Sequence, residues 1–273
     1  MLYLCSSNSA PMNIPFYKFH GTGNDFIMVD NRTNVFSKNN TNLVHNLCHR
    51  RFGIGADGLI LLENSENPEE DFKMVYFNSD GNQSSMCGNG GRCLVAFAKL
   101  LGIIEEMAAF GAIDGLHEAT ISENIVSLKM QDVTANGINQ GELFLDTGSP
   151  HHILFSDQVG DVDVKHQGAT IRYSDKYESS GGTNVNFVQQ TGEDTFLVRT
   201  YERGVEDETY SCGTGVTAVA IAVNAVGKTN SKSIHLETPG GKLEVSFDVN
   251  NGVYTNIWLT GPTAKVFKGE LEC

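Results

Sequence analysis

The chain has 273 residues, enough for one large domain or two modest domains, each with a core of its own. Its 19 lysine and arginine residues stand against 33 aspartate and glutamate residues, and the formal net charge of −14 argues against a nucleic-acid groove or an anionic membrane surface as partner. A hydrophobic content of 40% and 29 glycines fit an ordinary globular protein that is rich in turns.

The first twelve residues, MLYLCSSNSAPM, are predicted to form a loose extension, with Met12 as an alternative start. The stretch has no basic start, and its apolar run is too short for a secretion signal. No segment of the chain reaches the roughly 18 consecutive apolar residues that indicate a membrane-spanning helix. We therefore expect a cytoplasmic protein without a membrane partner.

The predicted elements are short strands around one apolar helix in each half. In chain order, strand-like composition and length favour strands at 73–77, 125–130, 195–201, 233–237 and 242–247. The segments CLVAFAKLL (93–101) and VTAVAIAVNAV (216–226) are predicted helices that are apolar on nearly every face. A short helix of this kind is typical of a buried position, so we expect strands to wrap around each helix.

A series of motifs occurs twice along the chain, in the same order and 125 residues apart. The shift carries Cys87 to Cys212, Tyr76 to Tyr201 and the Thr-Gly pair at 22–23 to the pair at 147–148. FGIGADGLILLE corresponds to SGGTNVNFVQQ with a small slip. Several matches in one order indicate two copies of one fold.

These patterns predict an α/β (α+β) protein of two pseudo-symmetric domains, each of strands wrapped around a central apolar helix. The N-terminal domain is expected to comprise residues 13–120 plus 260–273, and the C-terminal domain residues 121–259.

The six cysteines are few and irregularly spaced, which does not fit a disulfide framework, and we expect free thiols. No Cys-x-x-Cys or His-x-x-x-His pair offers the spacing of zinc ligands, so no metal is expected. Cys93 and Cys48 are interpreted as structural residues, and Cys5 and Cys273 as incidental residues near the termini.

Cys87 and Cys212 each precede a predicted helix and have glycines beside them. A glycine-rich helix start lets a ligand approach the backbone, and its free N–H groups favour a carboxylate and a thiolate. A single such cysteine would be interpreted first as a buried structural residue, but the repeat reverses this preference. Two equivalent thiols suit the inversion of a stereocentre, in which one removes a proton and the other delivers a proton to the opposite face. This chemistry requires no cofactor.

The chain resembles the diaminopimelate epimerase family from about residue 13 to residue 270. The resemblance rests on FHGTGNDFIMVD, FGIGADG, FNSDG, MCGNGGRC, GSPH, TNVNF, YERGVEDET and SCGTG, in this order. It implies a cofactor-independent homodimeric epimerase that interconverts LL- and meso-diaminopimelate for lysine and cell-wall precursor synthesis. It also implies that the active site lies in the cleft between the two pseudo-symmetric domains.

The resemblance also implies roles for individual residues. Cys87 and Cys212 match the acid/base pair of the family. Gly88-Asn89 and Gly213-Thr214 match the backbone clamps on the reacting carboxylate, and Asn24 matches a substrate-binding asparagine.

A second set matches the groups that recognise the distal amino-acid end of the substrate: Asn78, Asn184 and Arg203. The planar fork of an arginine suits a carboxylate. Glu202 and His151 match polar residues that assist binding and catalysis.

Two positions depart from the family pattern. Gly58 stands where many members have glutamine, and Ser149 where many have asparagine.

The nearest alternative function is a proline or hydroxyproline racemase, which the residues suited to a distal amino-acid end disfavour. A thiol hydrolase or transferase with one nucleophilic cysteine, and an amino-acid-binding protein without activity, are the alternatives from other classes; both leave the paired thiols unexplained.

Overall fold

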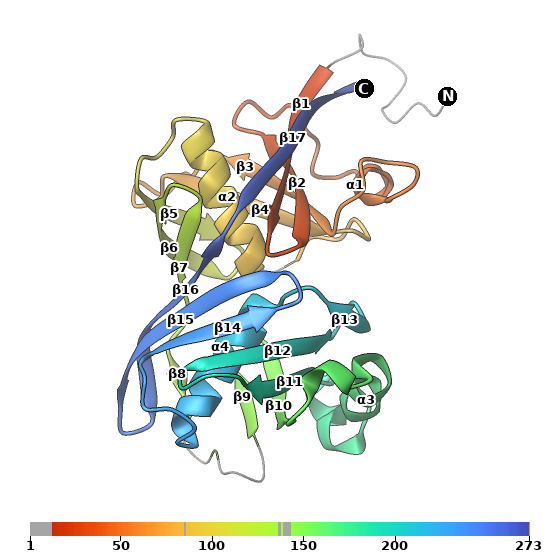
Figure 1. The fold of residues 1–273 in the computed structure, drawn as a ribbon. Coiled ribbons are helices and arrows are strands. Elements are labelled where there is room, and N and C mark those ends of the chain that lie inside the picture. The colour runs from red at the N-terminus through yellow and green to blue at the C-terminus, as the bar shows by residue number, and fades with distance from the viewer. Residues whose placement is uncertain (1–12, 85, 136–137, 139–142, 273) are drawn as a thin grey trace. The chain divides into compact units, whose positions relative to one another are not determined.

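The computed structural model describes residues 13–84, 86–135, 138 and 143–272 (Figure 1). The chain divides into two compact units. Unit 1 contains the residues up to Val126 and those from Thr263 onward, and unit 2 contains Ser127–Pro262. Within the part of the chain that is described, no helix has both the length and the apolar character needed to cross a membrane.

Unit 1 is a strand-rich unit with two helices among its described residues. Its elements are β1 (Asn13–Gly21), β2 (Asn24–Asp30), α1 (Thr41–Cys48), β3 (Gly58–Glu63), β4 (Phe72–Asn78), α2 (Gly88–Leu100), β5 (Met107–Ala112), β6 (Gly115–Ser122) and β17 (Ala264–Glu272). Strand β1 pairs antiparallel with β2 and with β17, β2 pairs parallel with β3, and β3 pairs antiparallel with β4. Strand β4 then pairs parallel with β5, which pairs antiparallel with β6. In Figure 1 the blue β17 lies along the red β1.

Unit 2 follows the same plan with additional helical segments. After β7 (Ile125–Lys129), which crosses the boundary between the units, its elements are β8 (Val133–Thr134), β9 (Leu143–Asp146), β10 (Pro150–Phe155), η1 (Val159–Asp161), α3 (Val164–Arg172), η2 (Asp175–Ser180), β11 (Asn184–Gln190), β12 (Thr195–Glu202), β13 (Asp207–Thr209), α4 (Gly213–Ala225), β14 (Ser233–Thr238), β15 (Gly241–Asn250) and β16 (Val253–Pro262). Strand β9 pairs antiparallel with β10, β10 parallel with β11, and β11 antiparallel with β12. Strand β12 pairs parallel with β14, and β14 antiparallel with β15.

The pairing of the strands confirms the internal repeat. Ile60 pairs with Tyr76 in unit 1, and Val185 pairs with Tyr201 in unit 2, so both partners are shifted by 125. The expected slip in the repeat lies in the preceding strand pair, β2 with β3 in unit 1 and β10 with β11 in unit 2. Ile27 pairs with Leu59, whereas Asn184, the residue 125 after Leu59, pairs with His151 instead of residue 152.

The two central helices correspond residue for residue: α2 and α4 are both 13 residues long and begin and end 125 residues apart. Both start earlier than their apolar sequences suggest, because the glycine-rich segments after the cysteines form the first helical turn.

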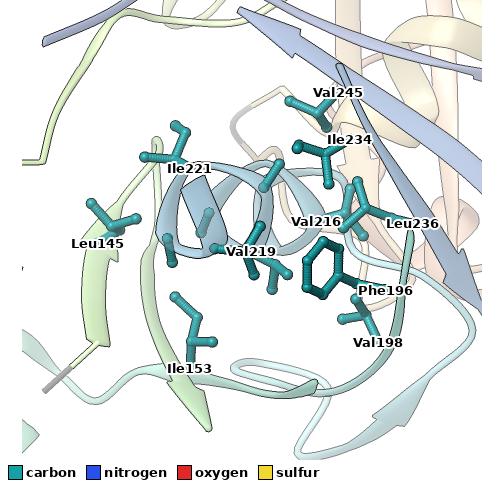
Figure 2. Packing of buried hydrophobic residues seen from close by; sticks show 14 of the residues in the cluster. Leu145, Ile153, Phe196, Val198, Val216, Val219, Ile221, Ile234, Leu236 and Val245 are labelled. Carbon is teal, nitrogen blue, oxygen red and sulfur yellow. The ribbon is translucent and has the colours of Figure 1, made fainter. Parts of the chain in front are cut away.

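Helix α4 is the centre of the core of unit 2. Figure 2 shows Val216, Val219 and Ile221 on this helix, with Phe196, Ile234 and Leu236 from the surrounding strands. Burying each such side chain contributes about 1.5–3 kcal/mol. The polar interruptions are satisfied, since Thr217 Oγ1 donates to the carbonyl of Gly213 and Asn224 Nδ2 donates to the carbonyl of Ser231.

Helix α2 lies against β1, β2, β3 and β6 of unit 1. Phe97 packs on Tyr17 and Phe19 of β1, with ring centroids 5.1 and 5.9 Å apart. Cys93 of α2 and Cys48 at the end of α1 are buried, as expected for structural residues. Burial raises the pKa of the Cys48 thiol to about 12 and also raises the pKa of Cys93, which keeps both protonated.

Candidate active site

Cys87 and Cys212 occupy the N-cap positions of α2 and α4. Both have extended backbones, and their carbonyls accept the first helical hydrogen bonds, from Gly91 N at 2.7 Å and from Val216 N at 3.0 Å. The N–H groups of the next residues have no partner within the helix and carry partial positive charge. Each cysteine therefore precedes a backbone segment that suits a carboxylate.

The Cys87 cluster consists of Cys87, Asn24, Asn89, Arg92 and Asp57. Cys87 Sγ lies 3.6 Å from Asn24 Oδ1, which also accepts a hydrogen bond from Asn89 Nδ2 at 3.3 Å. Asn24 Nδ2 donates to Asp57 Oδ2 at 2.6 Å. The pairing of β2 with β3 places Asn24 close to Asp57, since Asn24 begins β2 and Asp57 directly precedes β3.

Arg92 is a fully buried cation in the first turns of α2. Its Nη2 donates to Asn89 Oδ1 at 2.9 Å and to Thr22 Oγ1 at 3.2 Å, while Nε and Nη1 have no hydrogen-bond partner among the described residues. Burial lowers the pKa of Arg92, and the nearby thiols Cys93 and Cys87 act in the opposite direction. The equivalent residue of α4 is the neutral Thr217.

An ionic group supports Asp57 behind the cluster. Arg50 Nη2 contacts both Asp57 Oδ1 at 2.6 Å and Asp25 Oδ1 at 2.8 Å, and Lys18 Nζ lies 2.8 Å from Asp25 Oδ2. Burial raises the pKa of Asp25, but the hydrogen bonds from Arg50 and Lys18 outweigh it and bring this pKa to about 2. Asp25 is therefore fixed as an acceptor near neutral pH.

The Cys212 cluster consists of Cys212, Thr214, His151 and Asn186. Thr214 Oγ1 lies 3.4 Å from Cys212 Sγ and 2.9 Å from His151 Nε2. His151 Nδ1 lies 3.1 Å from Asn186 Nδ2, and Asn186 Oδ1 accepts a hydrogen bond from Thr200 Oγ1 at 2.9 Å. Complete burial, together with the charge of Arg203, lowers the pKa of His151 to about 3, so its imidazole is neutral.

Asn184 and Arg203 form a second polar group in unit 2. Asn184 Nδ2 donates to Ser149 Oγ and to the carbonyl of Pro150, both at 2.9 Å, and Asn184 Oδ1 accepts from Arg203 N at 2.8 Å. Arg203 Nη2 donates to Ser149 Oγ at 3.3 Å. The amide of Asn184 thus uses both its N–H donors on the protein and holds the backbone at Arg203.

The remaining site candidates lie at strand ends. Asn78 ends β4, and its side-chain amide has no hydrogen-bond partner within the described part of the chain. Glu202 ends β12, and its Oε2 accepts from Thr209 Oγ1 at 2.9 Å. Gly58 begins β3, where a Cβ would lie 2.5 Å from the carbonyl oxygen of Phe77. The local backbone therefore leaves no room at position 58 for a glutamine side chain.

Sequence analysis did not single out three residues of these clusters: Arg92, Asn186 and Asp57. Arg92 directly precedes the apolar run 93–101, Asn186 is a polar residue within β11, and Asp57 is a polar residue directly before β3. Their significance depends on the pairing of distant strands, which no local pattern specifies.

The solved structures with similar folds define the class of protein. A PhzF-family phenazine biosynthesis protein of Bacillus anthracis superposes with a TM-score of 0.73 over 95% of this chain and 99% of that chain, at 13% identity. A hydroxyproline epimerase of Agrobacterium vitis gives a TM-score of 0.70 over 95% and 92% of the chains, also at 13% identity. The chain therefore has the fold of the PhzF and proline racemase proteins, as two repeated units of mixed α/β structure.

Sequence comparison identifies the family. The family model described as diaminopimelate epimerase matches residues 16–133 and 143–266. A diaminopimelate epimerase of Flavobacterium psychrophilum is 62% identical over 92% of this chain and 98% of its own length. Its counterpart in Aquifex aeolicus is 39% identical over 94% of this chain and 97% of its own length. The chain belongs to the diaminopimelate epimerase family.

Proposed function

We propose that the protein interconverts LL- and meso-diaminopimelate, with Cys87 and Cys212 as the acid/base pair. The observation that carries the proposal is that two cysteines occupy the same N-cap position in two equivalent helices. The relatives bearing the name of this activity match nearly the whole chain.

The reaction is a balanced exchange of two protons. The thiolate of one cysteine removes the α-proton and becomes a thiol, while the thiol of the other donates its proton to the opposite face of the carbon and becomes a thiolate. The N–H groups of Gly88-Asn89 and Gly213-Thr214 are proposed to bind the α-carboxylate, where they stabilise the negative charge that develops on the substrate. No cofactor takes part in this proposal.

Recognition of the distal amino-acid end distinguishes this proposal from a proline racemase. Arg203 offers a planar fork to a carboxylate, and Asn78 offers an amide without a protein partner among the described residues. Glu202 supplies a carboxylate for the distal ammonium group. Proline has no second amino-acid end, so these groups would have no part of the substrate to bind in a proline racemase. Asn24 and His151 are proposed to hold the two thiols in position rather than to recognise the distal end.

Two further predictions come from the family alone: a homodimer and a cytoplasmic location. Equilibrium ultracentrifugation of the purified chain tests the first, and fractionation of the source cells tests the second.

The test of the function follows deuterium. The protein is incubated in deuterated water with LL-diaminopimelate and, separately, with L-proline. We expect deuterium at one α-carbon of diaminopimelate as the meso form accumulates, and none in proline. Full epimerisation by Cys87→Ala or Cys212→Ala would exclude the two-thiol mechanism, and exchange into proline alone would favour the racemase.

A further inference from the structure

The turn that follows β12 contains Arg203 and ends at Glu206, a residue with a left-handed backbone. The φ of Glu206 is 59°, in the region that favours glycine. Its N–H donates to the carbonyl of Glu202 at 2.8 Å, which closes the turn around Arg203. The equivalent position of unit 1, 125 residues earlier, holds Gly81 with a φ of 89°. Unit 2 thus has a glutamate where unit 1 has a glycine, and contacts of the side chain must offset the strain of its backbone.

The carboxylate of Glu206 accepts hydrogen bonds from the turn itself, from β12 and from α3. Its Oε1 accepts from Gly204 N at 3.0 Å and from Arg172 Nη2 at 3.2 Å, and its Oε2 accepts from Tyr201 Oη at 3.2 Å. Tyr201 is buried in β12, and Arg172 lies in the last turn of α3. The side chain therefore ties the turn both to the strand that leads into it and to a neighbouring helix.

Helix α3 can present Arg172 to this turn because it packs directly on β11 and β12 (Figure 1). A Cβ at Gly168 would collide with Cβ of Tyr201, so the helix approaches the strand closely at this glycine. Arg172 lies four residues after Gly168 and hence on the same face of the helix. Val164, also on α3, is buried in one cluster with Val185 and Tyr201. The guanidinium of Arg172 is therefore supplied by a helix that is fixed on the strands.

Arg172 also holds the segment that leads into β11. Its Nη1 donates to the carbonyl of Gly181 at 2.9 Å, three residues before Asn184. Asn184 Oδ1 accepts from Arg203 N at 2.8 Å, so the two segments meet in the second polar group of unit 2. The side chain of Arg172 is only 14% exposed, so water screens its contacts less than those of a surface ion pair. One guanidinium thus fixes the chain before Asn184 and the chain after Arg203.

We propose that Arg172 and Glu206 are positioning residues for recognition of the distal end of the substrate. Their ion pair fixes the turn 203–206, and this turn sets the direction from which the guanidinium of Arg203 meets a carboxylate. The inference rests on the proposed function, because it assumes a substrate with a second amino-acid end. Neither residue contacts the substrate or takes part in the proton exchange in this proposal. Their loss should therefore weaken binding and leave the chemical step in place.

A second ion pair of α3 provides the matched control. Lys165 Nζ lies 2.5 Å from Asp207 Oδ2, and the two side chains are 69% and 46% exposed. Asp207 begins β13, directly after the turn that ends at Glu206. This pair joins the same helix to nearly the same part of the chain, but it lies outside the turn that carries Arg203. A change of substrate binding that is specific to the first pair therefore separates positioning of Arg203 from general support of α3.

The experiment compares Arg172→Met, Glu206→Gly and Lys165→Met in steady-state epimerisation of LL-diaminopimelate. Glu206→Gly removes the carboxylate and gives the positive φ a residue that adopts it freely, so this variant should fold. We expect KM to rise about fivefold to tenfold for Arg172→Met and Glu206→Gly, with kcat within about twofold of the wild type. Lys165→Met should leave both constants unchanged. A wild-type KM for the first two variants, or an equal rise of KM for Lys165→Met, would overturn the proposal.

A double-mutant cycle tests whether the pair acts through Arg203. In the background of Arg203→Lys, which lacks the planar fork, Glu206→Gly should raise KM by less than about twofold further. Additive rises of KM would show that Glu206 affects binding by another route and would contradict the proposal.

Hydrogen exchange without substrate separates this inference from the proposed function. The N–H of Arg203 is held by Asn184 Oδ1, and we expect its exchange to be at least about fivefold faster in Arg172→Met and Glu206→Gly, and unchanged in Lys165→Met. If exchange responds in this way but the wild type does not epimerise diaminopimelate, the proposed function fails and the link from the ion pair to Arg203 stands. If the wild type is active and neither exchange nor KM responds, the inference fails and the function stands.

Discussion

Gly90 and Gly215 occupy the same place in two equivalent helices, three residues after the cysteine that precedes each, but they face different neighbours. A Cβ at Gly215 would lie 2.7 Å from Asn186 Oδ1 and 3.3 Å from His151 Cε1. A Cβ at Gly90 would lie 2.9 Å from Cδ1 of Ile60, the far end of an apolar side chain. The first neighbour is held by hydrogen bonds, and the second can rotate away.

Gly215→Ala is therefore expected to be more harmful than Gly90→Ala. Both changes gain about 0.5–1 kcal/mol of helix propensity. At Gly215 the crowding of Asn186 should cost about 1–3 kcal/mol in unfolding free energy and lower kcat by displacing His151, while Gly90→Ala should stay within about 1 kcal/mol of the wild type. Urea unfolding and steady-state kinetics measure both. Equal losses from the two changes would mean that the polar cluster does not need this space.

The buried His151 should make the folded state sensitive to acid. Its pKa is about 3 in the folded protein and about 6.5 in an unfolded chain, so the unfolded state binds the proton more readily between these values. The corresponding stability is complete above pH 6.5 and is lost as the pH falls toward 3, by an amount on the order of 4 kcal/mol. The change His151→Gln, which keeps a donor and an acceptor, should flatten this part of the profile. Unfolding free energies of both proteins, measured from pH 3 to pH 7, give the difference, and parallel profiles would contradict the prediction.

Arg203→Lys should weaken substrate binding more than it affects turnover. The ammonium group cannot reproduce the planar fork, so we expect KM for diaminopimelate to rise about tenfold, with a smaller change in kcat. Arg199→Lys, four residues earlier and within β12, is the matched control. Arg199 pairs with Glu208 and donates to the carbonyls of Val159 and Val162, so its replacement should lower stability and leave KM unchanged. An unchanged KM for Arg203→Lys would remove Arg203 from the binding machinery.

Asn184→Ala should destabilise the protein, because the side chain of Asn184 is buried and makes three hydrogen bonds to its surroundings. The carbonyl of Pro150 and the N–H of Arg203 would lose their partners, at a cost of about 1–3 kcal/mol for each that stays buried and unsatisfied. Ser149→Ala removes one of these bonds and should cost less. Thermal unfolding of the two variants distinguishes a supporting role for Asn184 from a contact with substrate only, which would leave stability at the wild-type value.

The parts of the fold that sequence could predict are those with a local pattern or a repeat. The helices at Cys87 and Cys212 were predictable because glycines beside a cysteine precede an all-apolar run, and the constant offset related the two copies. Arg92 and Thr217 show the limit of this reasoning, since the repeat aligns them and yet one is a buried cation and the other a neutral residue. The direction of a hydrogen-bond network depends on which strands pair and on which charges end the network, and neither is encoded within a short window.

The pairing of β1 with β17 has a consequence for synthesis of the chain. Unit 1 takes strands from both ends of the chain, whereas unit 2 is one uninterrupted stretch. Until residues 264–272 have emerged from the ribosome, β1 has a partner on one side only and exposes an open strand edge. Unit 1 therefore cannot be completed before the whole of unit 2 has been synthesised, unlike an N-terminal domain that folds by itself during translation.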